Sequence, residues 1–211
     1  MNDWLGEFKA LGAVWMHGGS PRAPHALLTS GLHSNGFVNT TAVTSLPRLV
    51  DRILQASDGL SKSLPKESEV DWVVGSAMGA VTFAHAVALR VGCRAGYTEK
   101  DGDAMALVRF SMSPDNRVLL VEDVLTTGGS TLKTHAAVAK TGVKVLPFMV
   151  TIVNRSGKKA LETADVTKLE IRALVTLDIQ NWRPEDCPLC RAGSTALRPK
   201  SHWSELLAGA R

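Results

Sequence analysis

Between residues 70 and 180, short apolar runs alternate with segments of helical length, and this alternation restricts the possible folds more than any other feature. The apolar runs predict strands at 71–74, 107–110, 118–121, 144–152 and 171–177. The segments between them predict helices at 80–91 and 131–141. Apolar strands that alternate with helices are typical of a parallel sheet covered on both faces. We therefore expect an α/β fold with a mostly parallel central sheet flanked by helices.

The residues outside this core have other patterns. Apolar residues recur at helical spacing between residues 3 and 16, and a further helix is predicted at 46–56. Residues 24–44 place Ser, Gly, Asn and Thr between short apolar runs, a pattern typical of turns and short strands. We expect one domain over residues 1–211, made of a helix and a small N-terminal hood (1–45), the core (70–180) and a C-terminal tail folded over the domain (181–211).

The composition excludes several classes of protein. The 211 residues carry a net charge of only +4, with 5% aromatic residues, so neither a basic tract nor an aromatic ladder for nucleic acid is present. No apolar run reaches the roughly 18 residues of a membrane span, and the start of the chain lacks the layout of a signal peptide. Three cysteines exclude a disulfide framework. We expect a cytoplasmic protein that binds a small anionic substrate, with neither nucleic acid nor a membrane as partner.

Residues 118–131, which read VLLVEDVLTTGGST, carry the clearest chemical signal. A buried strand ends in two adjacent carboxylates, Glu122 and Asp123, and a polar loop then opens a helix. Two glycines allow backbone N–H groups to converge, and a helix N-terminus favours an anion. The pattern predicts a phosphate-binding cup beside carboxylates that can accept hydrogen bonds from sugar hydroxyls. The predicted cup consists of Thr126, Thr127, Gly128, Gly129, Ser130 and Thr131.

Other phosphate loops do not match this stretch. The cup has no lysine, so it is not the GxxxxGK loop of nucleotide-binding enzymes, and no GxGxxG follows a strand. The alternative is an ordinary strand–turn–helix connection with a capping serine and two solvated acids. The joint occurrence of a buried strand, an acid pair, four hydroxyls and two glycines favours the phosphate cup.

At this point the sequence resembles a known family. Residues 118–130 are similar to the 13-residue phosphoribosyl-diphosphate motif of type I phosphoribosyltransferases, and residues 73–80 (VVGSAMGA) resemble their diphosphate-binding loop. Residues 25–34 (HALLTSGLHS) resemble the hood segment of the orotate phosphoribosyltransferases. The CPLC ending at residues 187–190 resembles the tail of one bacterial branch of that group.

The resemblance implies transfer of a 5-phosphoribosyl group from phosphoribosyl diphosphate to orotate, a step of pyrimidine nucleotide synthesis. Glu122 and Asp123 would bind the ribose 2′- and 3′-hydroxyls, and the cup would hold the 5-phosphate. Ser76 and Ala77, in a loop that often contains a cis peptide in this family, would meet the diphosphate. The implied cofactor is Mg²⁺, held mainly by the substrate.

Further roles follow from the same resemblance. Phe37 matches an aromatic position next to the base, and Ser30 lies in the hood segment that would bind substrate. The loop after Tyr97 would be a flexible lid that reaches the neighbouring subunit of a homodimer, with Lys100 as its catalytic cation. Other lid cations of the family are missing here, and Arg109 is a candidate to supply one of the missing charges.

Other functions remain open at this stage. The acceptor is either orotate or a purine or another heterocyclic base. A second class is a non-catalytic protein that senses phosphoribosyl diphosphate, which the sparse lid allows and the complete acid pair argues against. A metal-dependent nucleotide hydrolase is a third possibility, although it should lack the hood segment.

Cys187 and Cys190 form one CxxC pair, which supplies two of the four ligands of a structural zinc site. His202, Cys93 or a second pair from a dimer are the candidates for the missing ligands. A redox pair and two packed free thiols are the alternatives. His25 and His33 flank the turn at Ser30 and Gly31, where they either face the base pocket or cap the turn.

Overall fold

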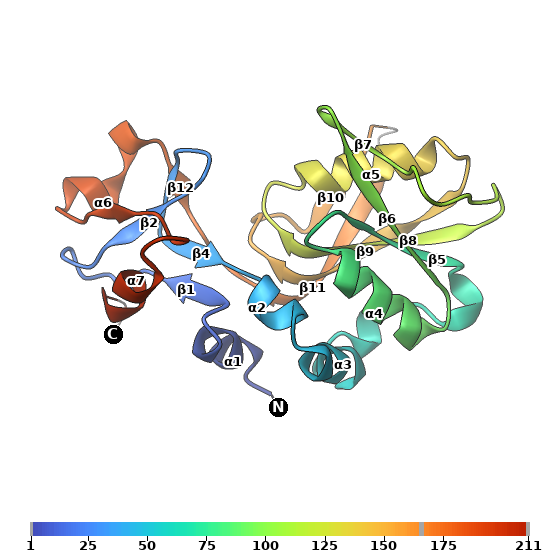
Figure 1. Ribbon diagram of the computed structural model, residues 1–211, viewed down its shortest axis with the longest axis horizontal. Helices are drawn as coiled ribbons and strands as arrows, with labels where there is room; N and C mark the ends of the chain where they lie inside the picture. Colours follow the sequence, from blue (N-terminus) through green and yellow to red (C-terminus); the bar gives the residue numbers. More distant parts are fainter. Residues whose placement is uncertain (1, 165–166, 210–211) are drawn as a thin grey trace. The chain divides into compact units, whose positions relative to one another are not determined.

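The structure is a computed structural model that describes residues 2–164 and 167–209 (Figure 1). The chain divides into two compact units. The first, which we call the core unit, comprises Met1–Trp4 and Val43–Leu177, and the second, the hood unit, comprises Leu5–Ala42 and Asp178–Arg211. The C-terminal stretch that we expect as a tail therefore belongs to the same unit as the hood segment.

The core unit is built on one large sheet, which we call the main sheet. Within residues 43–164 and 167–177, seven strands pair in the order β10-β11-β9-β8-β5-β6-β7. The four pairings from β11 to β6 are parallel, and only β10 and β7 at the two edges pair antiparallel. The predicted α/β class with a mostly parallel sheet is confirmed. The strands are β5 (Trp72–Ser76), β6 (Arg94–Asp101), β7 (Ala104–Ala106), β8 (Arg117–Leu125), β9 (Lys144–Asn154), β10 (Ala160–Glu162) and β11 (Lys168–Thr176).

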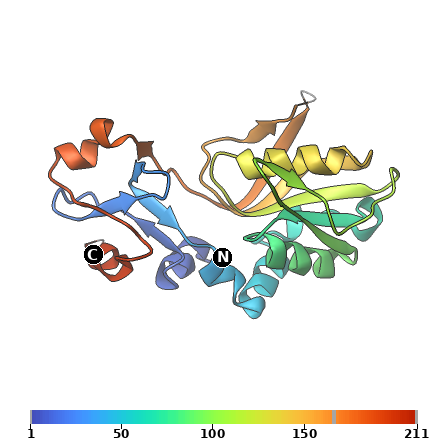
Figure 2. The ribbon, with the colours of Figure 1, turned by 45° about the horizontal axis from the view of Figure 1, so that its top comes forward.

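Helices cover both faces of the main sheet. In Figures 1 and 2, α5 (Gly129–Ala139) lies on one face, and α4 (Val81–Val91) with α3 (Pro47–Gln55) lies on the other. Helix α3 begins with a proline, whose fixed φ suits a first helical turn. The apolar side of α3 is buried. All residues of β5 are buried, as expected for a strand covered on two faces. Two short 3₁₀ helices, η1 (Ser61–Ser63) and η2 (Glu67–Glu69), precede β5.

The strand order places a crevice at the carboxyl ends of β5 and β8. The chain leaves β5 through α4 and adds β6 on one side, whereas it leaves β8 through α5 and adds β9 on the other. Crossovers between parallel strands are right-handed, so these two opposite steps place their helices on opposite faces. The loops after β5 and β8 therefore diverge, and ligands of open α/β sheets bind at such a reversal.

Two local predictions in this unit are wrong. Residues 107–110 form no strand, because Leu107 and Phe110 pack onto the core cluster from a loop. The strand lies earlier, where β6 and β7 form an antiparallel hairpin around Gly102. The predicted lid loop after Tyr97 is therefore partly strand. The sequence does not predict this strand, because the second half of β6 carries charged side chains and its last two residues are exposed.

The hood unit contains the remaining elements. In its described part, β12, β3, β2 and β13 pair in that order as a small sheet, and β1 pairs with β4. The predicted turns and short strands are confirmed over residues 24–40, whereas residues 41–44 form a short helix. The elements of the N-terminal stretch are α1 (Trp4–Ala10), β1 (Val14–Met16), β2 (His25–Leu27), β3 (His33–Ser34), β4 (Gly36–Val38) and α2 (Thr41–Thr44), of which α1 starts and α2 ends with residues counted in the core unit. Those of the C-terminal stretch are β12 (Asn181–Trp182), η3 (Pro184–Asp186), α6 (Pro188–Arg191), β13 (Ala196–Leu197) and α7 (Trp203–Gly209).

The helix predicted over residues 3–16 ends early, because Gly12 terminates it. Gly12 has a φ of +68°, its N–H donates to the carbonyl of Lys9, and the N–H of Ala13 donates to that of Phe8. This hydrogen-bond pair is the Schellman motif, which stops a helix at a left-handed residue. The apolar residues that follow belong to β1, and Trp15 is buried there.

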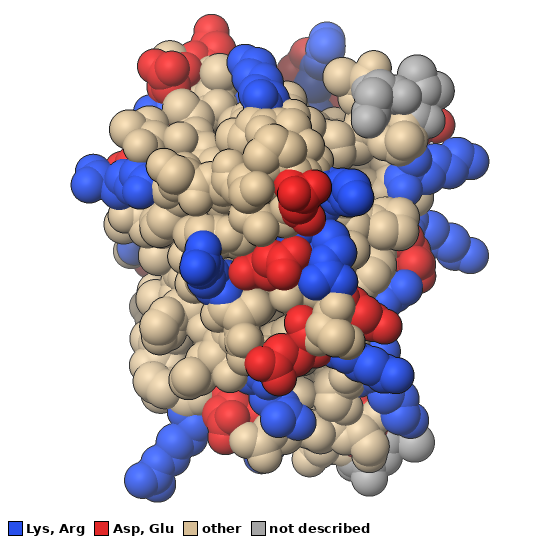
Figure 3. Space-filling model, turned by 90° about the vertical axis from the view of Figure 1, so that its right-hand side faces the viewer, with Lys and Arg blue, Asp and Glu red and all other residues tan. Residues whose placement is uncertain are grey.

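The surface carries both signs of charge. On the face that Figure 3 draws, Lys and Arg are interspersed with Asp and Glu among large uncharged areas. None of the helices in the described parts of the chain has both the length and the apolar character needed to span a membrane. The interspersed charges agree with the scattered basic residues of the sequence.

Candidate functional site

The loops after β5 and β8 frame a cavity of about 270 Å³ in the core unit. This cavity lies at the strand-order reversal, where an open α/β sheet binds ligands. It brings together residues that are far apart in the sequence but follow two adjacent strands. The cavity is lined by Ser76, Ala77, Gly79, Glu122, Asp123, Val124, Leu125, Thr126, Thr127, Gly128, Gly129, Ser130 and Thr131.

Glu122 lies on the buried side of this cavity. Its Oε2 accepts hydrogen bonds from Ser76 Oγ at 2.7 Å and Thr131 Oγ1 at 3.3 Å. Burial raises the pKa of Glu122 to about 8; the hydrogen bond from Ser76 opposes this shift, and the charge of Asp123 adds to it. Glu122 therefore holds a proton at neutral pH when no cation is bound beside it.

Asp123 has a different neighbour, Gly79 in the loop after β5. A Cβ on Gly79 would lie only 2.7 Å from Asp123 Oδ2, so this carboxylate occupies space that any larger residue at position 79 would claim. The peptide between Ala77 and Met78 in the same loop is cis, as the resemblance predicts. The absent side chain of Gly79 thus lets the loop after β5 approach the acid pair closely.

The loop after β8 adopts the cup shape that the sequence predicts. Gly128 caps α5 with a φ of +87°, a left-handed conformation that favours glycine. Thr126, Thr127, Gly129 and Ser130 are exposed to the cavity, whereas Thr131 is buried. The first turn of α5 opens onto the same space, and its dipole favours an anion.

One cation beside the cup is missing from the sequence predictions. Lys158 Nζ lies 3.4 Å from the carbonyl oxygen of Thr127, at the rim of the cup. Lys158 follows β9, the strand adjacent to β8, so its loop leaves the same edge of the sheet. The sequence signal for Lys158 is a lysine shortly after β9. This signal is usable only once β9 is known to pair with β8, which the sequence alone does not show.

The other predicted site residues do not line this cavity. Lys100 is exposed at the end of β6, and Arg109 is exposed in an ion pair with Glu99, with a nitrogen–oxygen distance of 2.8 Å. In the hood unit, Ser30 is exposed in the turn between β2 and β3, and Phe37 is half-buried with its ring edge-on to Trp203. The roles assigned to these four residues stay predictions.

The predicted cysteine pair lies in the hood unit, beside His25 and His33. Neither sequence-based candidate for the missing ligands belongs to this group. His202 instead pairs with Glu205, with a nitrogen–oxygen distance of 2.8 Å, and Cys93 belongs to the core unit.

The arrangement at the main sheet can hold a phosphorylated sugar. N–H and hydroxyl donors gather at the helix start, and two carboxylates that can accept from hydroxyls line the same cavity. The family model described as "Phosphoribosyl transferase domain" matches residues 40–186.

Curated relatives extend the match beyond this domain. A protein named orotate phosphoribosyltransferase from Thermus thermophilus is 39% identical over 80% of this chain and 88% of its own. One from Caldicellulosiruptor bescii is 36% identical over 84% of this chain and 88% of its own. The crystal structure of orotate phosphoribosyltransferase from Aeropyrum pernix has the same fold, with a TM-score of 0.61 and 22% identity over 82% of this chain and 92% of that one. On the family match and these relatives together, the chain belongs to the phosphoribosyltransferase family.

Proposed function

We propose that this protein transfers the 5-phosphoribosyl group of phosphoribosyl diphosphate to orotate. A ring nitrogen of orotate replaces diphosphate at C1 of the ribose, and the products are orotidine 5′-phosphate and diphosphate. The observation that carries this proposal is the cup and acid pair at the β5/β8 reversal, in a family member whose curated relatives are named orotate phosphoribosyltransferases.

The cup and the acid pair would hold the donor at its two ends. Backbone N–H groups of the first turn of α5, with the hydroxyls of residues 126–131, would bind the 5-phosphate, and Lys158 would add a positive charge at the rim. Asp123 would accept hydrogen bonds from a ribose hydroxyl. Glu122 is held by Ser76 and Thr131, so its orientation is set before the donor arrives.

The acid pair fits the Mg²⁺ that the family implies. Mg²⁺ prefers oxygen ligands and commonly combines one or two carboxylates with substrate phosphates. Asp123 and Glu122 offer such oxygens beside the loop of Ser76 and Ala77, where the diphosphate would lie. The bound cation would offset the negative charge of the diphosphate as it leaves, while the substrate supplies most of its ligands.

This reaction needs no nucleophile from the protein. As the bond from C1 to diphosphate breaks, the ribose ring gains positive charge and the diphosphate gains negative charge. Asp123 would stabilise the ribose, and Lys100 on the β6–β7 hairpin would stabilise the leaving group. A closed hairpin would also exclude the water that hydrolyses the donor.

The acceptor base is assigned to the hood segment. Phe37 would contact the flat face of the base, and Ser30 would contribute from the exposed turn between β2 and β3. Phe37→Leu should therefore raise KM for orotate and leave KM for the donor unchanged, which steady-state kinetics with each substrate varied in turn would measure.

We also propose that the protein acts as a homodimer in the cytoplasm. The core unit carries a largely apolar groove of about 1070 Å³ on α3, α4 and β6, and Leu89 in it is 77% exposed. Arg48, Asp51 and Arg90 line the same groove, so it carries both signs of charge. A two-fold interface places one surface against itself, so a groove with both signs of charge can pair its own charges across such an interface.

The test is a turnover assay with phosphoribosyl diphosphate, Mg²⁺ and a panel of orotate, uracil, adenine, guanine, hypoxanthine and xanthine. Diphosphate release that depends on orotate alone is the expected result. Release with another base would retain the reaction and refute the acceptor. If no base reacts, donor binding measured by calorimetry would indicate a sensor, and absence of binding would refute the proposed donor site.

A further inference from the structure

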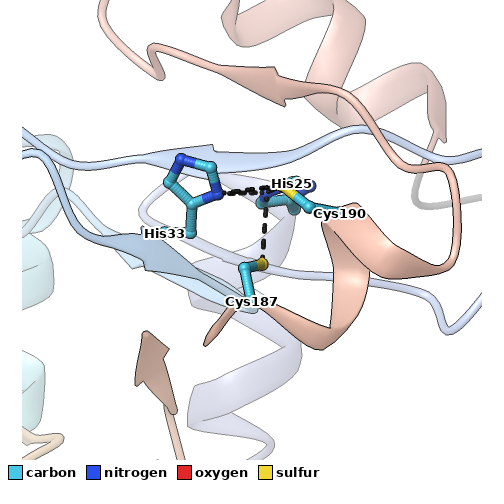
Figure 4. A group of neighbouring side chains, drawn as sticks. All are labelled: His25, His33, Cys187 and Cys190. Carbon is cyan, nitrogen blue, oxygen red and sulfur yellow. Dashed lines mark hydrogen bonds between the residues drawn. The ribbon is translucent and has the colours of Figure 1, made fainter. Parts of the chain in front are cut away.

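Two histidines and two cysteines of the hood unit point toward one another (Figure 4). His25 lies on β2, His33 on β3, Cys187 directly before α6 and Cys190 within it. One possible ligand atom from each residue lies within 4.8 Å of all the others. Three of the four residues are buried, and Cys190 is half-buried. The hairpin that carries the histidines and the helix that carries the cysteines thus meet at a single point.

Two of the separations between these atoms match the edges of a zinc tetrahedron, and two more are a few tenths of an ångström shorter. With Zn–S near 2.3 Å and Zn–N near 2.0–2.1 Å, a tetrahedral site has S–N edges of about 3.6 Å and an N–N edge of about 3.3 Å. His25 Nε2 lies 3.6 Å from Cys187 Sγ and 3.5 Å from Cys190 Sγ. His33 Nδ1 lies 3.2 Å from Cys190 Sγ and 2.9 Å from His25 Nε2. Small outward shifts of His33 would admit one ion at the centre.

The hydrogen bonds of Ser194 determine the tautomer of His25, and hence which ring nitrogen can offer a lone pair to the cluster. Ser194 Oγ donates its one proton to the carbonyl of Ala23 at 2.5 Å, so at His25 Nδ1, 2.7 Å away, it can only accept. Nδ1 therefore carries the ring proton of neutral His25, and Nε2 presents its lone pair to the two sulfurs and to His33. Metal-binding histidines are held by this kind of contact on their other nitrogen.

The geometry and ligand types select among metals. Thiolates favour zinc over magnesium or calcium, and a tetrahedral pair of sulfurs and nitrogens is typical of zinc or iron–sulfur sites. A two-iron cluster would hold the cysteines on one iron and the histidines on the other. The mutual separations below 4.8 Å leave room for one ion rather than for such a cluster.

We propose that His25, His33, Cys187 and Cys190 bind one Zn²⁺ as a closed structural site. On binding, both thiols lose their protons to solvent, and the neutral imidazoles each donate one lone pair. The two thiolates then balance the charge of the ion, so no net charge is buried. Four protein ligands leave no open position for a substrate, which is the pattern of a structural rather than a catalytic zinc.

The site would cross-link the two chain segments that make up the hood unit. His25 and Cys187 are 162 residues apart in the sequence, yet they meet inside this unit. The hood unit is assembled from two short stretches, Leu5–Ala42 and Asp178–Arg211, and Trp15, Ala26 and Leu206 form one buried apolar cluster in it. Small folding units commonly rely on a metal or disulfides because a small apolar core alone stabilises them weakly.

The test begins with the zinc content of the full-length protein, purified under reducing conditions without chelator and measured by plasma mass spectrometry. We expect one zinc per chain in the wild type and less than a tenth of that in the Cys187→Ser/Cys190→Ser double variant. Cys93→Ser is the matched control, because it removes the remaining cysteine in the core unit and should retain full zinc. Equal zinc in the double variant and in the wild type would overturn the proposal.

A second measurement covers the case in which the double variant does not fold. The wild type is stripped of metal with a chelator and titrated with Co²⁺ alone. We expect one equivalent to produce the intense visible bands of tetrahedral cobalt and a near-ultraviolet thiolate-to-cobalt band, and one equivalent of Zn²⁺ to abolish both. Absence of these bands, a Cys187–Cys190 disulfide in the freshly purified protein, or iron in place of zinc would each refute the site.

Discussion

Glu122 and Asp123 are adjacent in the sequence, but their surroundings give them different tasks. Glu122 is buried and accepts hydrogen bonds from Ser76 and Thr131, so it connects the loop after β5 to the start of α5. Asp123 lies against the glycine at position 79, in the loop after β5. We therefore expect Asp123 to contact the donor directly and Glu122 to respond to the charge that the donor and its cation bring.

The first prediction concerns Asp123→Asn. This change preserves shape and removes the negative charge, so the ribose loses the group that stabilises its developing positive charge. Turnover should fall on the order of 10²-fold or more, the scale of losing one electrostatic partner of a transition state. Steady-state assays would measure this, with Asp115→Asn on an exposed loop as the matched control. Wild-type turnover in Asp123→Asn, or an equal loss in the control, would refute the role.

The second prediction uses the raised pKa of Glu122. The folded state keeps its proton up to about pH 8, whereas the unfolded chain releases it near the ordinary value of about 4.3. Between these values the folded state binds more protons, so this group makes stability fall as pH rises, by up to about 1.4 kcal/mol per pH unit. Glu122→Gln cannot ionise and should therefore gain stability relative to the wild type as pH increases.

Urea unfolding at pH 5.5, 6.5, 7.5 and 8.5 measures this difference directly. Glu162→Gln, at an exposed position on β10, is the matched control and should follow the wild-type curve. A constant offset between Glu122→Gln and the wild type across this range would contradict a raised pKa for Glu122.

At the residue scale, the sequence predicts the groups that lie within one motif and misses those that meet across the fold. The acid pair and the cup residues are contiguous, so their spacing alone places them together. Lys158 reaches the cup only because β9 pairs with β8. His25 and His33 join Cys187 and Cys190 because two distant segments share the hood unit, which no local pattern encodes.

At the scale of elements, the β6–β7 hairpin is the element to which the family resemblance assigns the lid. Its described tip is exposed around Gly102, and Lys100 beside this tip is exposed and does not line the donor cavity of the same chain. Glu99 holds Arg109 in an exposed ion pair, so Arg109 is engaged on the hairpin itself. Lys100 is thus the cation of this hairpin that we expect to act on the leaving diphosphate.

The third prediction is that Lys100→Ala lowers kcat more than it weakens donor binding, with a loss on the order of 10²-fold in kcat. A group that meets the substrate only when the hairpin closes contributes mainly to the transition state. Stopped-flow or steady-state kinetics would separate kcat from KM, and calorimetry would give the donor affinity. Lys168→Ala, an exposed lysine on β11, serves as control. An unchanged kcat, or a loss explained entirely by weaker donor binding, would exclude Lys100 from catalysis.

Strands with an apolar run in the sequence are predicted well, and those whose apolar residues are interrupted by charged ones are not. The strands β5, β8, β9 and β11 are recovered because each contains a continuous apolar run. Strand β6 is missed because its exposed half carries Glu, Lys and Asp. Residues 107–110 are predicted as a strand because they are mostly apolar, but a loop that packs apolar side chains onto the core has the same composition as a buried strand. The end of α1 at Gly12 depends on one left-handed residue inside an otherwise helical pattern.

At the scale of the whole molecule, the alternation of strands and helices predicts the fold class but not the strand order. Both sides of β5 pair in parallel, with β6 on one side and β8 on the other. An order that simply followed the sequence would separate β5 from β8 by β6 and β7, and the two site loops would not be neighbours. The site thus depends on a pairing that only the assembled sheet determines.

The proposed homodimer leads to the fourth prediction. Leu89 is 77% exposed on α4, in the groove that also holds Arg48 and Asp51, and a carboxylate in its place would remove apolar contact and lose its hydration in the interface. Leu89→Asp should therefore weaken the dimer at least tenfold while the monomer stays folded. Light scattering after size exclusion should give twice the chain mass of 22.6 kDa for the wild type and approach one chain mass for the variant on dilution.

Because Leu89 lies outside the donor cavity, its effect on turnover isolates the contribution of the second subunit. If the hairpin of one chain completes the site of the other, the turnover of Leu89→Asp should rise with protein concentration in parallel with the dimer fraction. Leu11→Asp, a half-exposed leucine in the hood unit, should leave both mass and turnover unchanged. A monomeric variant with full turnover would show that each chain works alone, and Lys100 would then have to act within its own subunit.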